Sequence, residues 1–199
     1  MKNAVIFGAA GHTGKYITRR LMKSDDIKLT AFVRDPKKFG DMDITGVNIV
    51  CGDALNEADV KKAMEKQDIL ICSLEGDVLT MAQNIVSALK VTSVKRIIRI
   101  TGMGIHHEIT GPRSIMLNMY AKKRPEYIKA ADLIAASGAV ITLLRCPGIQ
   151  DGDNEKYCLT TEREQPAHRN VDRATLAQCI ADMIASETLG ANESLGITN

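Results

Sequence analysis

Short apolar runs alternate with amphipathic helical patterns along most of this 199-residue chain. The apolar runs are rich in Val, Ile and Leu, which is typical of strands that are buried on both faces of a parallel sheet. The pattern predicts such strands at residues 4–7, 28–33, 47–51, 69–73, 95–101 and 140–144. It predicts helices after residue 14, from residue 56, and at residues 80–89, 125–136 and 172–184.

This alternation predicts an α/β fold, a single doubly wound Rossmann domain over residues 1–199. Right-handed crossovers would order its parallel sheet 3-2-1-4-5-6. We expect Asn56 to cap the second helix and Gly138 to end the fourth. The later chain forms a small C-terminal extension, in which the polar residues 146–170 make a loop region on the substrate side. A short strand is expected near residues 157–160, and another at the end of the chain.

Three glycines, Gly8, Gly11 and Gly14, separate the first predicted strand from the first helix. Strand, glycine turn and helix in this order are the context that dinucleotide binding requires. Gly8 lets the chain turn tightly, Gly11 lets the backbone approach a pyrophosphate, and Gly14 lets the helix lie close to the sheet. We expect the pyrophosphate on the N–H groups at the helix N-terminus, around His12 and Thr13.

Two other interpretations of this segment fail. A nucleoside-triphosphate loop would have glycine in place of Ala9 and a hydroxyl residue in place of Tyr16. A secretory signal would have a longer apolar run than the roughly eight residues before His12, and no charged helix directly after it.

The second predicted strand ends at Arg34, about twenty residues after the last glycine, where a Rossmann fold selects its cofactor. An acidic residue there binds the ribose 2′-OH of NAD, whereas an arginine accommodates the 2′-phosphate of NADP. Arg34, with Lys37 or Lys38 beside it, favours NADP. Asp35 leaves NAD open, because it can pair with Arg34 or bind the ribose itself. The alternative is a solvated basic loop.

Composition excludes several classes of function. The net charge is +2 and no basic cluster has stacking aromatic residues between its members, so we expect no nucleic-acid partner. No apolar run approaches the length of a membrane helix, so we expect no membrane partner. The five cysteines form no C-x-x-C pair and no metal-ligand spacing, which indicates reduced thiols, no metal and a cytoplasmic location. A monomer or a homodimer fits these features.

The carboxyl ends of the first, second, fourth, fifth and sixth strands should meet at one edge of the sheet, where ligands gather. All five ends carry glycine, hydroxyl or charged residues. They are Gly8–Gly14, Arg34, Ser73–Gly76, Thr101–Gly104 and Cys146–Ile149.

Six segments carry a family resemblance: GAAGHTG (8–14), FVRDPKK (32–38), GDALN (52–56), KRIIRITGMG (95–104), AADLIAASG (130–138) and ITLLRCPGI (141–149). With them the chain resembles the atypical short-chain dehydrogenase/reductases, in particular the NmrA-like NAD(P)-binding group that includes flavin and biliverdin reductases. The resemblance implies further cofactor contacts. These are Asp53 and Ala54 at the adenine, then Leu74, Glu75, Gly76, Thr101 and Gly102 along the ribose and nicotinamide, and Pro147, Gly148 and Ile149 at the nicotinamide.

Typical members of that class use Y-x-x-x-K, in which a lysine assists a tyrosine that passes a proton to the substrate. Here Tyr120 is followed four residues later by Arg124, and Tyr127 by Ala131. Tyr120 with Arg124 suits a degenerate version of the motif. The alternative for Tyr120 is a half-buried amphipathic side chain.

Two further residues are catalytic candidates. Thr101 is placed to orient a substrate oxygen, and His106, with its neighbour His107, to supply a proton or close over the substrate. Arg145 is expected to pack or to pair at its strand end. These features favour an NADPH-preferring oxidoreductase that reduces a small acceptor such as a flavin, quinone or carbonyl compound. The alternative is an NADP(H)-sensing regulatory protein without turnover.

Overall fold

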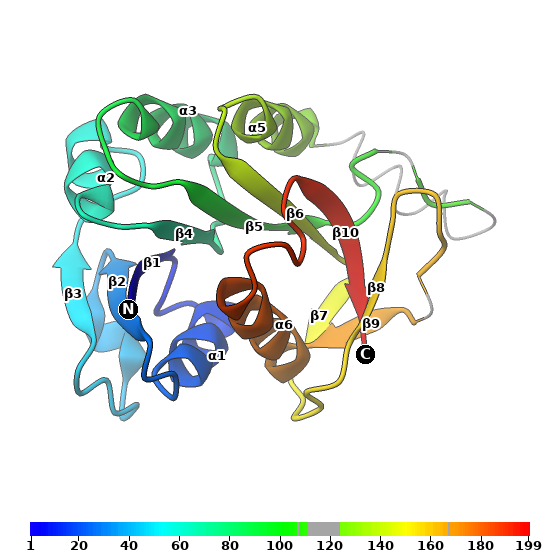
Figure 1. Cartoon of the computed structure of the whole chain (residues 1–199), viewed down its shortest axis with the longest axis horizontal. Helices are drawn as coiled ribbons and strands as arrows, with labels where there is room; N and C mark the ends of the chain where they lie inside the picture. The colour runs from blue at the N-terminus through cyan, green and yellow to red at the C-terminus, as the bar shows by residue number, and fades with distance from the viewer. Residues whose placement is uncertain (107, 111–123, 167) are drawn as a thin grey trace.

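A computed structural model describes residues 1–106, 108–110, 124–166 and 168–199 (Figure 1). Its main sheet has eight strands in the order β3-β2-β1-β4-β5-β6-β10-β8. The strands are β1 (Lys2–Phe7), β2 (Ile27–Val33), β3 (Asn48–Cys51), β4 (Ile69–Cys72), β5 (Arg96–Gly102), β6 (Val140–Cys146), β8 (Cys158–Thr160) and β10 (Glu193–Thr198). The predicted Rossmann order 3-2-1-4-5-6 is confirmed, and β10 and β8 extend it.

Helices cover both faces of this sheet (Figure 1). On one face lie α1 (His12–Leu21) and α6 (Arg173–Ala185), which pack against each other. The other face carries α2 (Glu57–Met64), α3 (Val78–Leu89) and α5 (Pro125–Ala135). A 3-10 helix, η1 (Pro36–Phe39), follows β2. This layering is that of a doubly wound α/β fold.

The central strand β1 shows why the apolar runs are continuous. Ala4 and Ile6 point into the core beneath α1 and α6, and Val5 and Phe7 point into the core beneath α2, α3 and α5. All four side chains are fully buried. A strand with a helix layer on each side has no polar face, which is why its sequence does not alternate.

The helix ends follow local capping chemistry. The predicted cap at Asn56 is confirmed, since its side chain accepts hydrogen bonds from the N–H groups of Ala58 and Asp59. Helix α3 begins two residues before the predicted start because Asp77 caps it, accepting from Thr80 N at 3.2 Å. The predicted cap Gly138 is wrong: α5 already ends at Ala135, and Gly138 turns the chain towards β6 with a φ of +85°.

Residues 146–170 contain more regular structure than the polar pattern predicted. The short strand near residue 158 and the terminal strand β10 are confirmed, and they pair antiparallel. The segment also contributes β7 (Gly148–Gln150), which pairs in parallel with β9 (Asn170–Asp172) to form a second, two-stranded sheet. These strands are short and mostly polar, so no apolar run marked them.

The free cysteines divide by exposure. Cys51 on β3 and Cys158 on β8 are exposed, and these two strands form the opposite edges of the main sheet. The other three thiols, those of Cys72, Cys146 and Cys179, are buried. Among the helices that the structure describes, none combines the length and the apolar character needed to span a bilayer.

Candidate functional site

A cleft of about 880 Å³ opens at the carboxyl ends of the central strands. Most residues predicted to bind a cofactor line it, although they come from segments far apart in the sequence. They are Gly8, Gly11, His12, Thr13, Arg34, Asp53, Ala54, Leu74, Glu75, Thr101, Gly102, Pro147, Gly148 and Ile149. Three other predicted site residues, Gly14, Gly76 and His106, do not line it, and Tyr120 lies outside the described residues.

The glycine turn after β1 is dictated by close backbone approaches. Gly8 has a φ of +84°, and a Cβ atom there would lie 2.1 Å from the carbonyl oxygen of Ser73. A Cβ atom on Gly14 would lie 2.0 Å from the carbonyl oxygen of Gly8 and 2.7 Å from that of Ala9. Gly14 therefore has the packing role expected of it, although the contact is with the turn itself. Any side chain at either position would push the turn open.

The N-terminus of α1 lies in the cleft wall and has no capping side chain or acidic residue of its own. The N-cap, Gly11, has no side chain to bond the first N–H groups, and the first turn contains no acidic residue. His12 and Thr13 follow it in the cleft wall. Free N–H groups and the positive end of the helix dipole make such a terminus suitable for a phosphate group.

The end of β2 carries the residues expected to select the cofactor. Arg34, Asp35 and Lys38 line the cleft and are exposed. The Asp35 carboxylate accepts a hydrogen bond from Lys37 N at 3.0 Å and so caps η1. No described carboxylate forms an ion pair with Arg34, so the pairing with Asp35 that the sequence left open is not found.

The wall after β3 is held by its own hydrogen bonds. Asp53 accepts from Leu55 N and donates its own N–H to the Asp59 carboxylate, both at 3.0 Å. The carbonyl oxygen of Ala54 accepts from the side chain of Asn84 on α3 at 3.0 Å. These hydrogen bonds hold this edge of the cleft in place beside Phe32. The ring centroids of Phe32 and Phe7 lie 4.5 Å apart.

The opposite end of the cleft is mainly apolar, with Met103, Ile105 and Ile128 in its wall. Tyr127 lines it too, and its hydroxyl accepts a hydrogen bond of 3.5 Å from the guanidinium of Arg124. In the sequence, Tyr127 is followed four residues later by Ala131 and not by a lysine, so no motif marked its place in the cleft.

Thr101 also lies in this wall, at the end of β5. The residue is only 6% exposed, and its hydroxyl oxygen is covered by protein with no hydrogen-bond partner among the described residues. Its predicted role in orienting a substrate oxygen stays a prediction, since the oxygen does not face open space in this structure.

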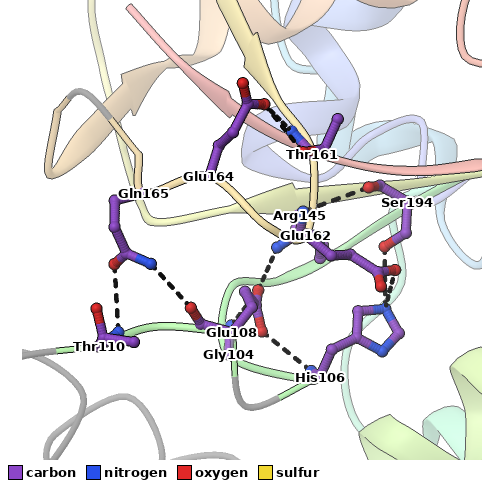
Figure 2. A network of polar contacts seen from close by, with 10 residues as sticks. All are labelled: Gly104, His106, Glu108, Thr110, Arg145, Thr161, Glu162, Glu164, Gln165 and Ser194. Carbon is purple, nitrogen blue, oxygen red and sulfur yellow. Dashed lines mark hydrogen bonds and ion pairs between the residues drawn. The ribbon is translucent and has the colours of Figure 1, made fainter.

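Behind this wall lies a network of polar contacts around Arg145 and Glu108 (Figure 2). The two side chains form an ion pair and are 1% and 2% exposed, so Arg145 pairs at its strand end as predicted. Glu108 also accepts from the N–H groups of Gly104 at 2.9 Å and His106 at 3.1 Å. Arg145 reaches the carbonyl oxygen of Ser194 on β10 at 3.3 Å. The network fastens the segment after β5 to β6 and β10.

Ionisation of Glu108 depends on these contacts. Burial of the carboxyl acts to raise its pKa, but hydrogen bonds from Gly104 N–H and from Arg145, with the charge of Arg145, hold the pKa below its ordinary value of 4.5. The carboxylate is therefore charged at neutral pH, and it neutralises a guanidinium that would otherwise be buried alone.

His106 belongs to the network behind the wall rather than to the cleft (Figure 2). Its Nε2 lies 2.9 Å from Ser194 Oγ and 3.3 Å from a carboxylate oxygen of Glu162. The ring thus links the segment after β5 to β10 and to the chain after β8. Its neighbour His107 lies outside the described residues.

The cleft wall also contains a cation, Arg173, that no sequence motif marked. Arg173 is the first residue of α6, it lines the cleft, and its Nη1 lies 2.8 Å from Asp151 Oδ1. A cation at a helix N-terminus opposes the helix dipole, and that mismatch is a signal which could have identified it. Across the described ranges, no group of three His, Cys, Asp or Glu side chains is arranged to hold a metal ion.

Comparison with known proteins agrees with this geometry. The sequence profile of a family described as NAD(P)H-binding matches residues 8–187. A Rossmann-fold NAD(P)-binding family protein from Shigella flexneri is 33% identical, and the match covers 100% of this chain and 94% of that chain with a TM-score of 0.84.

Two more distant structures share the fold. A wide-type short-chain dehydrogenase/reductase from Veillonella parvula, solved in complex with NADP, is 22% identical over 100% of this chain and 94% of that one, with a TM-score of 0.82. The anaerobillin reductase ChuY from Escherichia coli O157:H7 is 18% identical over 99% and 97% of the two chains, also with a TM-score of 0.82. The resemblance to atypical short-chain dehydrogenase/reductases that the motifs indicated is confirmed.

Proposed function

This chain belongs to the NAD(P)H-binding family, and we propose that it is an NADPH-preferring reductase of a small acceptor such as a flavin, quinone or carbonyl compound. The observation that carries the proposal is the course of the cleft. It runs from a phosphate-binding turn and a basic loop at one side to an apolar wall with a tyrosine at the other. The NADP-bound relative from Veillonella and the reductase ChuY support the same class.

The residues present fit a bound dinucleotide. The uncapped N-terminus of α1, with no side chain on Gly11, would hold the pyrophosphate. The firm edge at Asp53 and Ala54 would border the adenine, and the segment Pro147–Ile149 would approach the nicotinamide. Arg34 would bind the 2′-phosphate, since no described carboxylate neutralises it.

When bound, the reduced nicotinamide would supply a hydride, which is one proton and two electrons. The acceptor then needs one proton, and we assign its delivery to Tyr127, whose O–H bond breaks as the proton moves to the acceptor oxygen or nitrogen. The guanidinium of Arg124, 3.5 Å away, stabilises the phenolate left behind, and water restores the proton. The apolar wall with Met103, Ile105 and Ile128 excludes water from the reacting atoms.

The proposal is tested by NADPH oxidation with a panel of flavins, quinones and aldehydes. We expect turnover of at least one acceptor, and a drop in kcat of about a hundredfold in Tyr127→Phe with unchanged NADPH binding. Normal kcat in Tyr127→Phe would reject this proton donor and leave the reductase proposal standing. Tight NADPH binding with no turnover of any acceptor would reject the reductase itself.

The cofactor preference has its own test. Arg34→Gln should weaken NADPH binding about tenfold and leave NADH binding unchanged, because only NADPH carries the 2′-phosphate. Lys37→Gln is the matched control, since Lys37 is a neighbouring cation outside the cleft wall. A wild-type preference for NADH would overturn the assignment.

A second candidate is an NADP(H)-sensing regulatory protein without turnover. Within the parts of the chain that the structure describes, no tyrosine in the cleft has a lysine four residues later, and the Thr101 hydroxyl is covered. The same acceptor panel separates the two candidates, because the regulator binds NADPH and oxidises none.

A further inference from the structure

We infer that Arg173, at the start of α6, is a second anchor for the diphosphate of the bound dinucleotide. The inference rests on the proposed cofactor, and it adds a residue that neither the glycine motif nor the resemblance pointed to. It follows from the position of Arg173, from its unused hydrogen-bond donors and from its neighbours.

The position is set by the second sheet. Strand β9 pairs with β7, whose Gly148 and Ile149 line the cleft, and Arg173 directly follows β9. The pairing brings the start of α6 to the cleft edge. The Arg173 side chain is 15% exposed, so most of its length is held by protein while it still contributes to the cleft wall.

The donors of Arg173 are mostly unused. A guanidinium has five N–H donors, and the described structure gives Arg173 one partner, Asp151 Oδ1 at 2.8 Å. Its Nε is covered and has no hydrogen-bond partner among the described residues. Arg96, by contrast, donates to three backbone carbonyl groups, those of Met183, Ser186 and Leu189. The hydrogen-bond donors of Arg96 thus stabilise the fold, whereas most donors of Arg173 remain available to a ligand.

The neighbours of Arg173 place it close to the phosphate-binding turn. Asp151 Oδ1 also lies 3.4 Å from the hydroxyl of Tyr16, so this one oxygen joins the start of α6 to α1. Tyr16 is four residues after His12 on α1, and His12 lies in the cleft wall. The guanidinium is therefore held beside the helix terminus that would receive the diphosphate.

The chemistry of this corner suits a phosphate oxygen. Arg173 puts a positive charge at the positive end of α6, next to the N-cap Asp172, whose carboxylate accepts from Gln150 Nε2 at 2.8 Å and makes no capping bond to the helix. An anion that binds in the cleft beside Arg173 interacts favourably with both the guanidinium and the positive end of the helix dipole. A planar guanidinium can donate two parallel hydrogen bonds to a phosphate, which helix N–H groups then complement.

Fragments of the cofactor test the inference without any turnover. ADP contains the diphosphate and no 2′-phosphate, whereas 2′-AMP contains the 2′-phosphate and no diphosphate. By isothermal titration calorimetry, Arg173→Gln should weaken the binding of ADP, NAD and NADP about tenfold each and change 2′-AMP binding by less than about twofold. Arg34→Gln should do the reverse, weakening 2′-AMP and NADP and sparing ADP.

Arg169→Gln is the matched control, because it removes an exposed arginine from the same segment outside the cleft wall. It should leave all four affinities unchanged. If Arg173→Gln fails to fold, Arg173→Lys keeps the charge and loses the planar fork, and ADP binding should weaken about threefold.

Three outcomes would overturn the inference: unchanged ADP binding in Arg173→Gln, an equal loss for 2′-AMP, or a change confined to the KM of the acceptor. The last would assign the cation to an anionic group of the substrate. Absence of acceptor turnover would reject the proposed reductase and leave the ADP result valid, so the two failures are distinguishable.

Discussion

Different interactions hold the two sides of the cleft in place. The glycine turn is fixed by backbone atoms only a few residues apart, such as Gly14 against the carbonyl oxygen of Gly8. The facing wall is fixed by charges far apart in the sequence, since Arg145 and Glu108 are 37 residues apart and Arg173 and Asp151 are 22. The first side is sensitive to an added atom, whereas the second is sensitive to the loss of one member of its buried ion pair. The two sides should therefore respond to opposite kinds of substitution.

Glu108→Gln should have the largest effect. It leaves Arg145 charged and 1% exposed with no carboxylate, and we expect the free energy of unfolding to fall by about 3–5 kcal/mol. Urea denaturation measures this, with Glu164→Gln, an exposed carboxylate drawn in Figure 2, as the control that should change little. The double variant Glu108→Leu with Arg145→Met should recover most of the loss. An effect no larger than that of the control would contradict a wall held by charge.

The same pair predicts a pH dependence. The pKa of Glu108 is lowered in the folded state, so its contribution to stability is complete above its ordinary value of 4.5 and is lost as the pH falls through the folded-state pKa. The stability gap between the wild type and Glu108→Gln should therefore be constant near neutral pH and narrow below about pH 4.5. Urea titrations at a series of pH values measure the gap. A gap of constant size down to pH 3 would mean that shape, and not charge, supports the wall.

Gly14→Ala should act on the other side of the cleft. Its Cβ atom would lie 2.0 Å from a carbonyl oxygen, and we expect a loss of about 3 kcal/mol together with weaker ADP binding. Gly76→Ala is the matched control. Gly76 has a φ of +100°, but no atom of the described residues lies within 4 Å of an added Cβ atom, so only backbone strain of about 1 kcal/mol remains. Equal losses at the two glycines would show that backbone strain, rather than close approach, shapes the turn.

Glu162→Gln should have the smallest effect. Glu162 is 48% exposed and contacts His106 at 3.3 Å, so water screens the pair and the loss in urea denaturation should stay below about 1 kcal/mol. A loss that approached that of Glu108→Gln would mean that exposed and buried members of the network contribute equally to the free energy of unfolding.

The sequence allowed the turn, the strand order and most helices to be predicted because these features depend on local chemistry. Glycine spacing, apolar runs and caps such as Asn56 act over a few residues. The predicted start of α3 was two residues too late, because the sequence pattern did not identify Asp77 as the N-cap.

The facing wall could not be predicted in the same way. Strands β7 and β9 have no apolar pattern, and nothing in local chemistry pairs residue 108 with residue 145 or residue 151 with residue 173. The first contact exists only once the main sheet has ordered β6 and β10 beside β5, and the second only once β7 has paired with β9. Roles for the residues at the strand ends could be proposed from the sequence. The position of Arg173 beside them became visible only in the folded structure.

Because three cysteines are buried and two are exposed, the protein has two native sites for labelling with thiol-reactive probes. Burial raises the pKa of Cys72 and of Cys179 to about 12, and burial also raises the pKa of Cys146, so these thiols stay protonated and inert at neutral pH. A maleimide probe would therefore react with Cys51 and Cys158, on the two outer strands of the sheet. Two spin labels or a donor–acceptor dye pair at these sites would span the whole sheet and report, without any substitution, whether its edges move when a nucleotide binds.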